Sequence, residues 1–189
     1  MKKLGFGLMR LPIIGGDQSK IDIEAVKKMV DEFLAKGFTY FDTAYVYHGG
    51  FSEVAFREAV VKRYPRDAYT ITTKLPLFSK PDRAGMEKIF AESMERLGVD
   101  YIDYYWLHAM GKDSYEHAQK VDAFGYLKEL KEAGKIKHIG FSFHDGPEML
   151  EKILTEHPEA EYVQLQINYL DWEDGWVRAR RCYEVAVKY

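Results

Sequence analysis

The sequence of 189 residues has little cysteine, no charge excess and no long apolar run. A single thiol, Cys182, cannot form an internal disulfide or a four-thiolate metal site, and it fits a reducing compartment. Lys and Arg total 27 against 30 Asp and Glu, a formal charge of −3 that leaves no basic excess for nucleic acid or an anionic membrane. The apolar stretch near the N-terminus is broken by Arg10, and no run approaches the roughly 20 residues that cross a bilayer. We therefore expect a cytoplasmic protein with neither nucleic acid nor membrane as partner.

What the sequence does contain is a globular composition, with 47% apolar and 30% charged residues, which predicts a single domain over residues 1–189. Short apolar runs alternate with longer stretches whose apolar residues recur at three-to-four spacing. The runs predict strands over 3–10, 38–43, 69–74, 101–108, 137–142 and 162–168. The longer stretches predict helices over 21–35, 52–63, 81–97, 118–133, 147–156 and 178–188. Six strand–helix units in this order indicate an α/β protein with a parallel sheet.

Glycines mark the ends of three predicted helices. Gly37, Gly98 and Gly134 follow the helical stretches directly. A glycine adopts the left-handed backbone that often closes a helix at little cost, because it has no Cβ. These glycines therefore support the predicted helix ends.

The strand–helix units repeat almost evenly, which predicts a barrel. Equal right-handed units either close into a barrel or form a doubly wound sheet, whose first strand is followed by a glycine-rich phosphate turn and a helix. The segment after Gly5 and Gly7 lacks the third glycine and continues into Leu11 and Pro12 instead of a helix. We therefore expect a TIM-type (β/α)8 barrel. Since a complete barrel takes about 250 residues, six units predict an incomplete one, with open edge strands through which copies of the chain could self-associate.

Four titratable residues lie at or just after the C-terminal ends of predicted strands, where barrel enzymes build their active sites. They are Asp42, Tyr47, Lys74 and His108. A tyrosine is a poor acid at neutral pH, because its pKa is about 10. We expect the Lys74 ammonium to lower the pKa of Tyr47, with Asp42 keeping Lys74 charged and His108 orienting a carbonyl. No side chain qualifies as the nucleophile, which points to hydride from a reduced nicotinamide.

Seven segments carry a resemblance to a known enzyme family. They are LGFG at 4–7, FDTAYVY at 41–47, SE at 52–53, ITTK at 71–74, DYYWLH at 103–108, IGFS at 139–142 and QLQINYLDW at 164–172. Together they resemble the aldo-keto reductases, over nearly the whole chain. The resemblance implies a (β/α)8 barrel that reduces an aldehyde or ketone with NADPH or NADH. It also implies that Asp42, Tyr47, Lys74 and His108 form a catalytic tetrad, with Tyr47 as the proton donor.

The same resemblance implies a set of cofactor contacts. Ser142 and Gln164 are expected to bind the nicotinamide carboxamide, and Met9 and Arg10 to lie where the first loop meets the cofactor. The sequence departs from the family at Phe143, where an Asn often follows the serine. It is similar to a bacterial branch whose longer members add a ferredoxin-like extension, and we expect neither that extension nor the last two barrel units here. A truncated, non-catalytic remnant that acts as a binding or assembly element is the alternative.

A metal site is not expected. A barrel metallohydrolase would place His-x-His at the end of the first strand, where this chain has Leu8, Met9 and Arg10. A retaining glycosidase would place paired carboxylates near the strand ends. The fourth predicted strand ends instead in His108.

Overall fold

The computed structural model describes residues 3–189, which divide into two compact units. The first unit runs to Leu75 and includes Ala84–Tyr104, and the second comprises Pro76–Arg83 and Tyr105–Tyr189. Strand β4 (Ile102–Met110) begins in the first unit and ends in the second. The expectation of a single domain over residues 1–189 stays a prediction.

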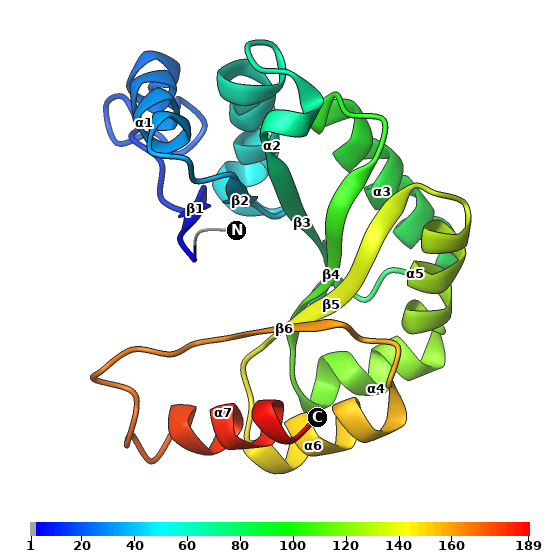
Figure 1. The fold of residues 1–189 in the computed structure, drawn as a ribbon. Helices are drawn as coiled ribbons and strands as arrows, with labels where there is room; N and C mark the ends of the chain where they lie inside the picture. Colours follow the sequence, from blue (N-terminus) through cyan, green and yellow to red (C-terminus); the bar gives the residue numbers. More distant parts are fainter. Residues whose placement is uncertain (1–2) are drawn as a thin grey trace. The chain divides into compact units, whose positions relative to one another are not determined.

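The first unit is built from parallel strands in sequence order, each followed by a helix. Strand β1 (Gly5–Gly7) pairs with β2 (Tyr40–Asp42), and β2 pairs with β3 (Thr70–Pro76). The helices are α1 (Ile23–Ala35), α2 (Phe51–Phe56), which continues as a π-helical turn (Arg57–Val61), and α3 (Arg83–Leu97). Colours from blue to green follow these elements in Figure 1.

An aromatic cluster forms the core of the first unit. Phe33 of α1 packs on Phe41 of β2 with ring centroids 5.2 Å apart, and Phe56 of α2 lies 5.4 Å from the same ring. Phe41 is fully buried. Because side chains alternate along a strand, burying Phe41 against the helices turns its neighbours Tyr40 and Asp42 to the other face of the sheet.

The second unit continues the same alternation. After β4 come α4 (Lys112–Lys120), α5 (Ala123–Glu132), β5 (Ile136–Phe143), α6 (Pro147–Glu156), β6 (Tyr162–Leu165) and α7 (Ala179–Lys188). Strands β5 and β6 pair in parallel, with Gly140 opposite Tyr162. Helices α6 and α7 lie side by side, as Figure 1 shows. Within residues 3–189, no helix is both long enough and apolar enough to cross a membrane.

Most predicted elements are present with bounds shifted by one or two residues, and the largest differences are in one helix and two strands. The helix predicted over 118–133 is wrong as a single helix: Asp122 breaks it with φ +50°, and its carboxylate caps α5 by accepting from the Gly125 amide. The first strand ends at Gly7, and after it the Leu8 carbonyl accepts from the Ser52 hydroxyl (2.9 Å). The sixth strand ends before Asn168, whose side chain accepts from the Leu170 amide and forms a turn instead.

The expected helix ends are confirmed. Gly37, Gly98 and Gly134 have φ of +77°, +66° and +69°. At Gly98 a Cβ would lie 2.8 Å from the Arg57 side chain, so close packing adds to the backbone requirement there.

Candidate active site

A fully buried lysine lies at the centre of the candidate site in the first unit. The Lys74 side chain has no exposed surface. Its ammonium donates to Asp42 Oδ1 at 2.8 Å, to the Thr43 carbonyl at 2.8 Å and to the Tyr47 hydroxyl at 3.4 Å. An ammonium has three hydrogens and no lone pair, so these three acceptors account for all of its donors. A buried charge with this degree of pairing is tolerated, whereas an unpaired one is not.

The parallel sheet explains why these residues meet. Asp42 lies opposite Thr72 in the β2–β3 register, and the Thr43 amide donates to the Thr72 carbonyl at 2.8 Å. Lys74 follows two residues later on the same face of β3, so its side chain reaches back over the end of β2. Tyr47 begins a 3-10 turn (Tyr47–Gly50) directly after this strand end. The structure therefore brings Asp42, Tyr47 and Lys74 together.

Burial dominates the electrostatics of the site. Burial lowers the pKa of Lys74, and the neighbouring Asp42 charge opposes that shift. Burial also raises the pKa of Tyr47 to about 12, with the negative charge of Asp42 acting in the same direction and Arg10 against it. The expected lowering of the Tyr47 pKa is therefore wrong, because burial and the Asp42 charge raise this pKa by more than the Arg10 charge lowers it. At neutral pH Tyr47 is a neutral phenol that still holds its proton.

The first loop supplies Met9 and Arg10 directly after β1. Met9 is 52% exposed, and Arg10 is exposed as well. Arg10 lies near enough to Tyr47 for its charge to act on the Tyr47 pKa. Arg10 thus borders the Tyr47 side of the site in the first unit.

His108 lies in the second unit, near the end of β4. It is buried, and its ring meets Phe78 edge to face with centroids 5.7 Å apart. The next residue, Ala109, has φ +53°, which is unusual for a residue with a Cβ. The Ala109 amide donates to Ser142 Oγ at 2.8 Å, and its carbonyl accepts from the Ser114 hydroxyl at 3.1 Å. Two serines therefore hold the strained backbone that follows His108.

Ser142 and Gln164 are direct neighbours in the β5–β6 register. Side chains at paired positions of parallel strands lie on the same face. Ser142 is buried, and because its oxygen accepts from Ala109, its own hydrogen can be donated elsewhere. A hydroxyl beside a primary amide offers the donors and acceptors that a carboxamide requires, so this pair fits the nicotinamide end of the expected cofactor.

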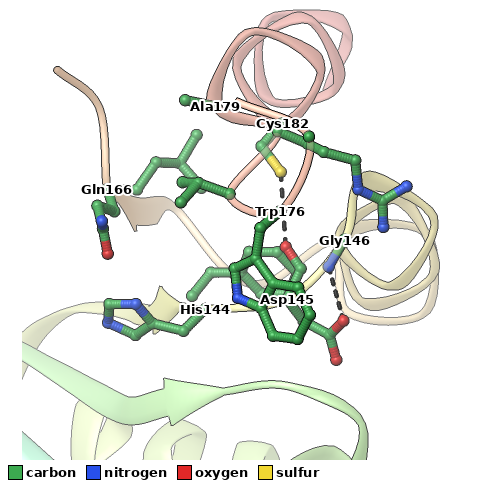
Figure 2. Close-up of a pocket in the computed structure, with 12 residues that line it drawn as sticks. His144, Asp145, Gly146, Gln166, Trp176, Ala179 and Cys182 are labelled. Atoms are coloured by element: carbon green, nitrogen blue, oxygen red, sulfur yellow. Dashed lines mark hydrogen bonds between the residues drawn. The ribbon is translucent and has the colours of Figure 1, made fainter. Parts of the chain in front are cut away.

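A cavity of about 520 Å³ lies in the second unit at the C-terminal ends of β5 and β6, where Phe143 and Leu165 line it. It is bounded by the loop after β5, the end of β6 and the start of α7. Figure 2 shows His144 and Gln166 on one side of it, and Ala179 and Cys182 of α7 on another. The lining residues are Phe143, His144, Asp145, Gly146, Leu165, Gln166, Gly175, Trp176, Val177, Arg178, Ala179 and Cys182.

Two residues of these sites were missed in the sequence. The His48 ring accepts from the Leu11 amide through Nε2 (3.0 Å) and faces the Gln18 carbonyl through Nδ1 (3.1 Å), so it ties the turn after Tyr47 to the first loop. Its own φ is +52°. Neither His48 nor Ala109 has a sequence signal of its role, because both roles depend on backbone atoms of distant segments.

Comparisons with known proteins identify the family and the fold. The aldo/keto reductase family model matches residues 3–189. The chain is 31% identical over 182 residues to a probable aldo-keto reductase 1 of Glycine max, covering 91% of this chain and 49% of that protein. A putative aldo-keto reductase of Pseudomonas aeruginosa shares the fold with a TM-score of 0.76 and 20% identity, over 97% of this chain and 68% of that one. An aldo-keto reductase of Klebsiella pneumoniae, solved in complex with NADPH, matches with a TM-score of 0.68 and 20% identity, over 96% and 60% of the two chains.

The chain belongs to the aldo/keto reductase family. The prediction of a TIM-type barrel fold with six strand–helix units is confirmed by the parallel strands and by these structural neighbours. The chain spans about half the length of curated relatives that it matches, at 49% of the Glycine max protein and 49% of an aldo-keto reductase of Mycolicibacterium smegmatis.

Proposed function

We propose that the protein of which this sequence forms all or part is an NAD(P)H-dependent reductase that converts an aldehyde or ketone to an alcohol, with Tyr47 as the proton donor. The contact between Lys74 and Tyr47 supports this most directly. The ammonium donates to the phenol oxygen at 3.4 Å, so the phenol hydrogen is directed to a different acceptor. A substrate carbonyl oxygen is such an acceptor.

The roles of the four residues follow from their chemistry. Tyr47 holds its proton until negative charge develops on a carbonyl oxygen beside it. The Lys74 ammonium then stabilises the phenolate that remains, and Asp42 keeps that ammonium charged in a poorly hydrated site. For His108, the role of orienting the carbonyl rests on family membership and on its place at the end of β4.

The cofactor, when bound, supplies the hydride that reduces the carbonyl carbon. We assign its carboxamide to Ser142 and Gln164, whose hydroxyl and amide lie on one face of neighbouring strands. The cavity at the ends of β5 and β6 is lined by Arg178, a cation that a phosphate-bearing ligand could use and that pairs with Glu148 at 3.2 Å in this structure. Met9 and Arg10 border the cofactor on the first loop in this proposal. NADPH and NADH are both candidates.

The proposal is tested by mixing the purified protein with NADPH or NADH and a panel of small aldehydes and ketones, and following absorbance of the reduced nicotinamide. We expect carbonyl-dependent oxidation that Tyr47→Phe abolishes, while circular dichroism of the variant stays the same. Saturable quenching of NADPH fluorescence measures binding separately. If neither reduced cofactor binds, the non-catalytic alternative is correct.

Self-association is a second element of the proposal. Within residues 3–189, strand β6 has β5 as its one neighbour in the sheet. The segment that follows β6 exposes large apolar side chains, among them Tyr169 at 89%, Leu170 at 74% and Trp176 at 92%. An open edge beside such a surface favours pairing with a second copy. Sedimentation at micromolar concentration tests it: a dimer that Leu170→Asp dissociates supports the proposal, and a clean monomer refutes it.

A further inference from the structure

The first unit contains an ion pair between a fully buried carboxylate and a partly exposed guanidinium that the proposed chemistry does not use. Glu53 of α2 has no exposed side-chain surface, and its Oε2 lies 3.5 Å from Nη1 of Arg96 on α3. Burying a carboxylate is costly even when it is paired, and a well-packed apolar residue often serves stability equally well. The pair is therefore a candidate for a role beyond stability.

One partner of the pair holds the strand that carries Lys74. The Thr73 hydroxyl donates to Glu53 Oε1 at 2.7 Å, and both side chains are completely buried. Thr73 directly precedes Lys74, so the two side chains point to opposite faces of β3. The bond from Thr73 to α2 fixes the rotation of the strand and hence the direction of the Lys74 side chain on the other face.

The other partner holds the loop that carries Tyr47. Arg96 Nη1 donates to the Tyr45 carbonyl at 3.3 Å, and the guanidinium carbon lies 4.3 Å from the centre of the Tyr45 ring. A Cβ built on Gly50 would lie only 2.9 Å from the same Nη1, and Gly50 has φ +96°. Arg96 is therefore packed against the chain on both sides of Tyr47, two residues before it and three after it.

We propose that the Glu53–Arg96 pair is a positioning unit that sets the Tyr47 hydroxyl against the Lys74 ammonium. Each partner contacts one of the two segments that must meet, and the ion pair joins them behind the site. The functional consequence rests on the proposed function, in which Tyr47 donates the proton. A shift of about 1 Å in such a contact can cost about 10²-fold in rate.

The test uses Glu53→Gln, which keeps an acceptor for Thr73 but removes the carboxylate that faces Arg96 Nη1. Glu92, which pairs with Nη2 of Arg96 at 3.4 Å from the same helix, is retained in the variant. A matched control is Glu58→Gln, on the next turn of the same helical segment, where Glu58 pairs with Lys62 at the surface. Arg96→Lys keeps the positive charge but loses the planar guanidinium group with its several N–H donors. It is a second test if Glu53→Gln does not fold. We expect kcat to fall by between tenfold and 10²-fold in Glu53→Gln, with KM changed less than about threefold, and no effect of Glu58→Gln.

A second readout does not depend on activity. With 13Cζ-labelled tyrosine, the Tyr47 resonance is assigned by its loss in Tyr47→Phe, and its position and alkaline titration are followed by NMR. The groups that face Tyr47 include Asp42, Lys74 and Arg10, all retained in the variants. We expect the Glu53→Gln resonance to move and its titration midpoint to fall toward the value of about 10 for an exposed tyrosine.

The two readouts separate the two proposals. If the parent protein reduces no carbonyl but the Tyr47 resonance moves in Glu53→Gln or Arg96→Lys and not in Glu58→Gln, the proposed function fails and the positioning role stands. If the parent is active and these variants match Glu58→Gln in kcat and in the Tyr47 titration, the positioning role is overturned.

Discussion

The Lys74 ammonium lies 2.8 Å from Asp42 Oδ1, with the lysine side chain fully buried and the aspartate side chain 14% exposed. This ion pair is largely excluded from water. The Coulomb attraction between the two charges and the hydration free energy that they lose are comparable, so the net contribution of the pair to stability is small. The same ammonium contacts the Tyr47 hydroxyl at 3.4 Å, and in the proposed function this contact is the reason for the pair.

Removing one partner of this pair should lower the free energy of unfolding far more than removing both partners. Asp42→Asn leaves a buried ammonium without its counter-charge, and we expect the free energy of unfolding to fall by about 3 kcal/mol. The double variant Asp42→Leu with Lys74→Met should recover most of that loss, and it should show no reductase activity. Urea unfolding at pH 7 measures both. A double variant less stable than Asp42→Asn would show that the charges themselves stabilise the fold.

Tyr47 should make stability depend on pH in the alkaline range. Its pKa is raised from 10 to about 12 in the folded chain, so folding favours the protonated phenol. That contribution is fully present below pH 10 and is lost as the pH rises toward 12. We expect the stability of the parent protein to fall more steeply than that of Tyr47→Phe between pH 10 and pH 12. Parallel urea curves for the two proteins over this range would contradict the prediction.

Glu161 should make the stability of the protein fall as the pH is lowered. Burial raises its pKa, but hydrogen bonds from Lys131, His138 and the Ile139 amide outweigh that effect and lower it to about 2. Its contribution is present above pH 4.5 and is lost as the pH falls toward 2. We expect Glu161→Gln to be less stable than the parent by about 1 to 2 kcal/mol at pH 7, allowing for partial exposure. The difference should shrink steadily in urea titrations carried out below pH 4.5.

A side chain at Gly140 should destabilise the protein. A Cβ there would lie 2.5 Å from the Tyr162 carbonyl of the paired strand and 2.8 Å from Nε1 of Trp106. The carbonyl is backbone and cannot turn away, so we expect Gly140→Ala to cost about 1 to 3 kcal/mol. Gly7→Ala is the matched control, since no atom lies within 4 Å of the Cβ built there. Equal thermal midpoints for the two variants would refute the explanation.

The sequence predicted much of the fold, because the signals for strands and helices are local. Phe41 and Asp42 fall on opposite faces of a short strand, and the alternation of their side chains is visible in the sequence. For Asp122, in contrast, the sequence pattern predicts a place within one long helix over 118–133. Its αL backbone and its cap on Gly125 depend on a local hydrogen bond that competes with the helix, and helical periodicity does not reveal such a competition.

For the candidate site, the sequence determined which residues stand at the strand ends, since Asp42, Lys74 and His108 each follow from strand periodicity and chain order. Only the tertiary structure decided that Lys74 has three acceptors, that Tyr47 is buried enough to raise its pKa, and that Glu53 meets Arg96 behind them. The physical reason is the separation along the chain over which each effect acts. Periodicity is a property of neighbouring residues, whereas desolvation and ion pairing depend on which distant segments fold against one another.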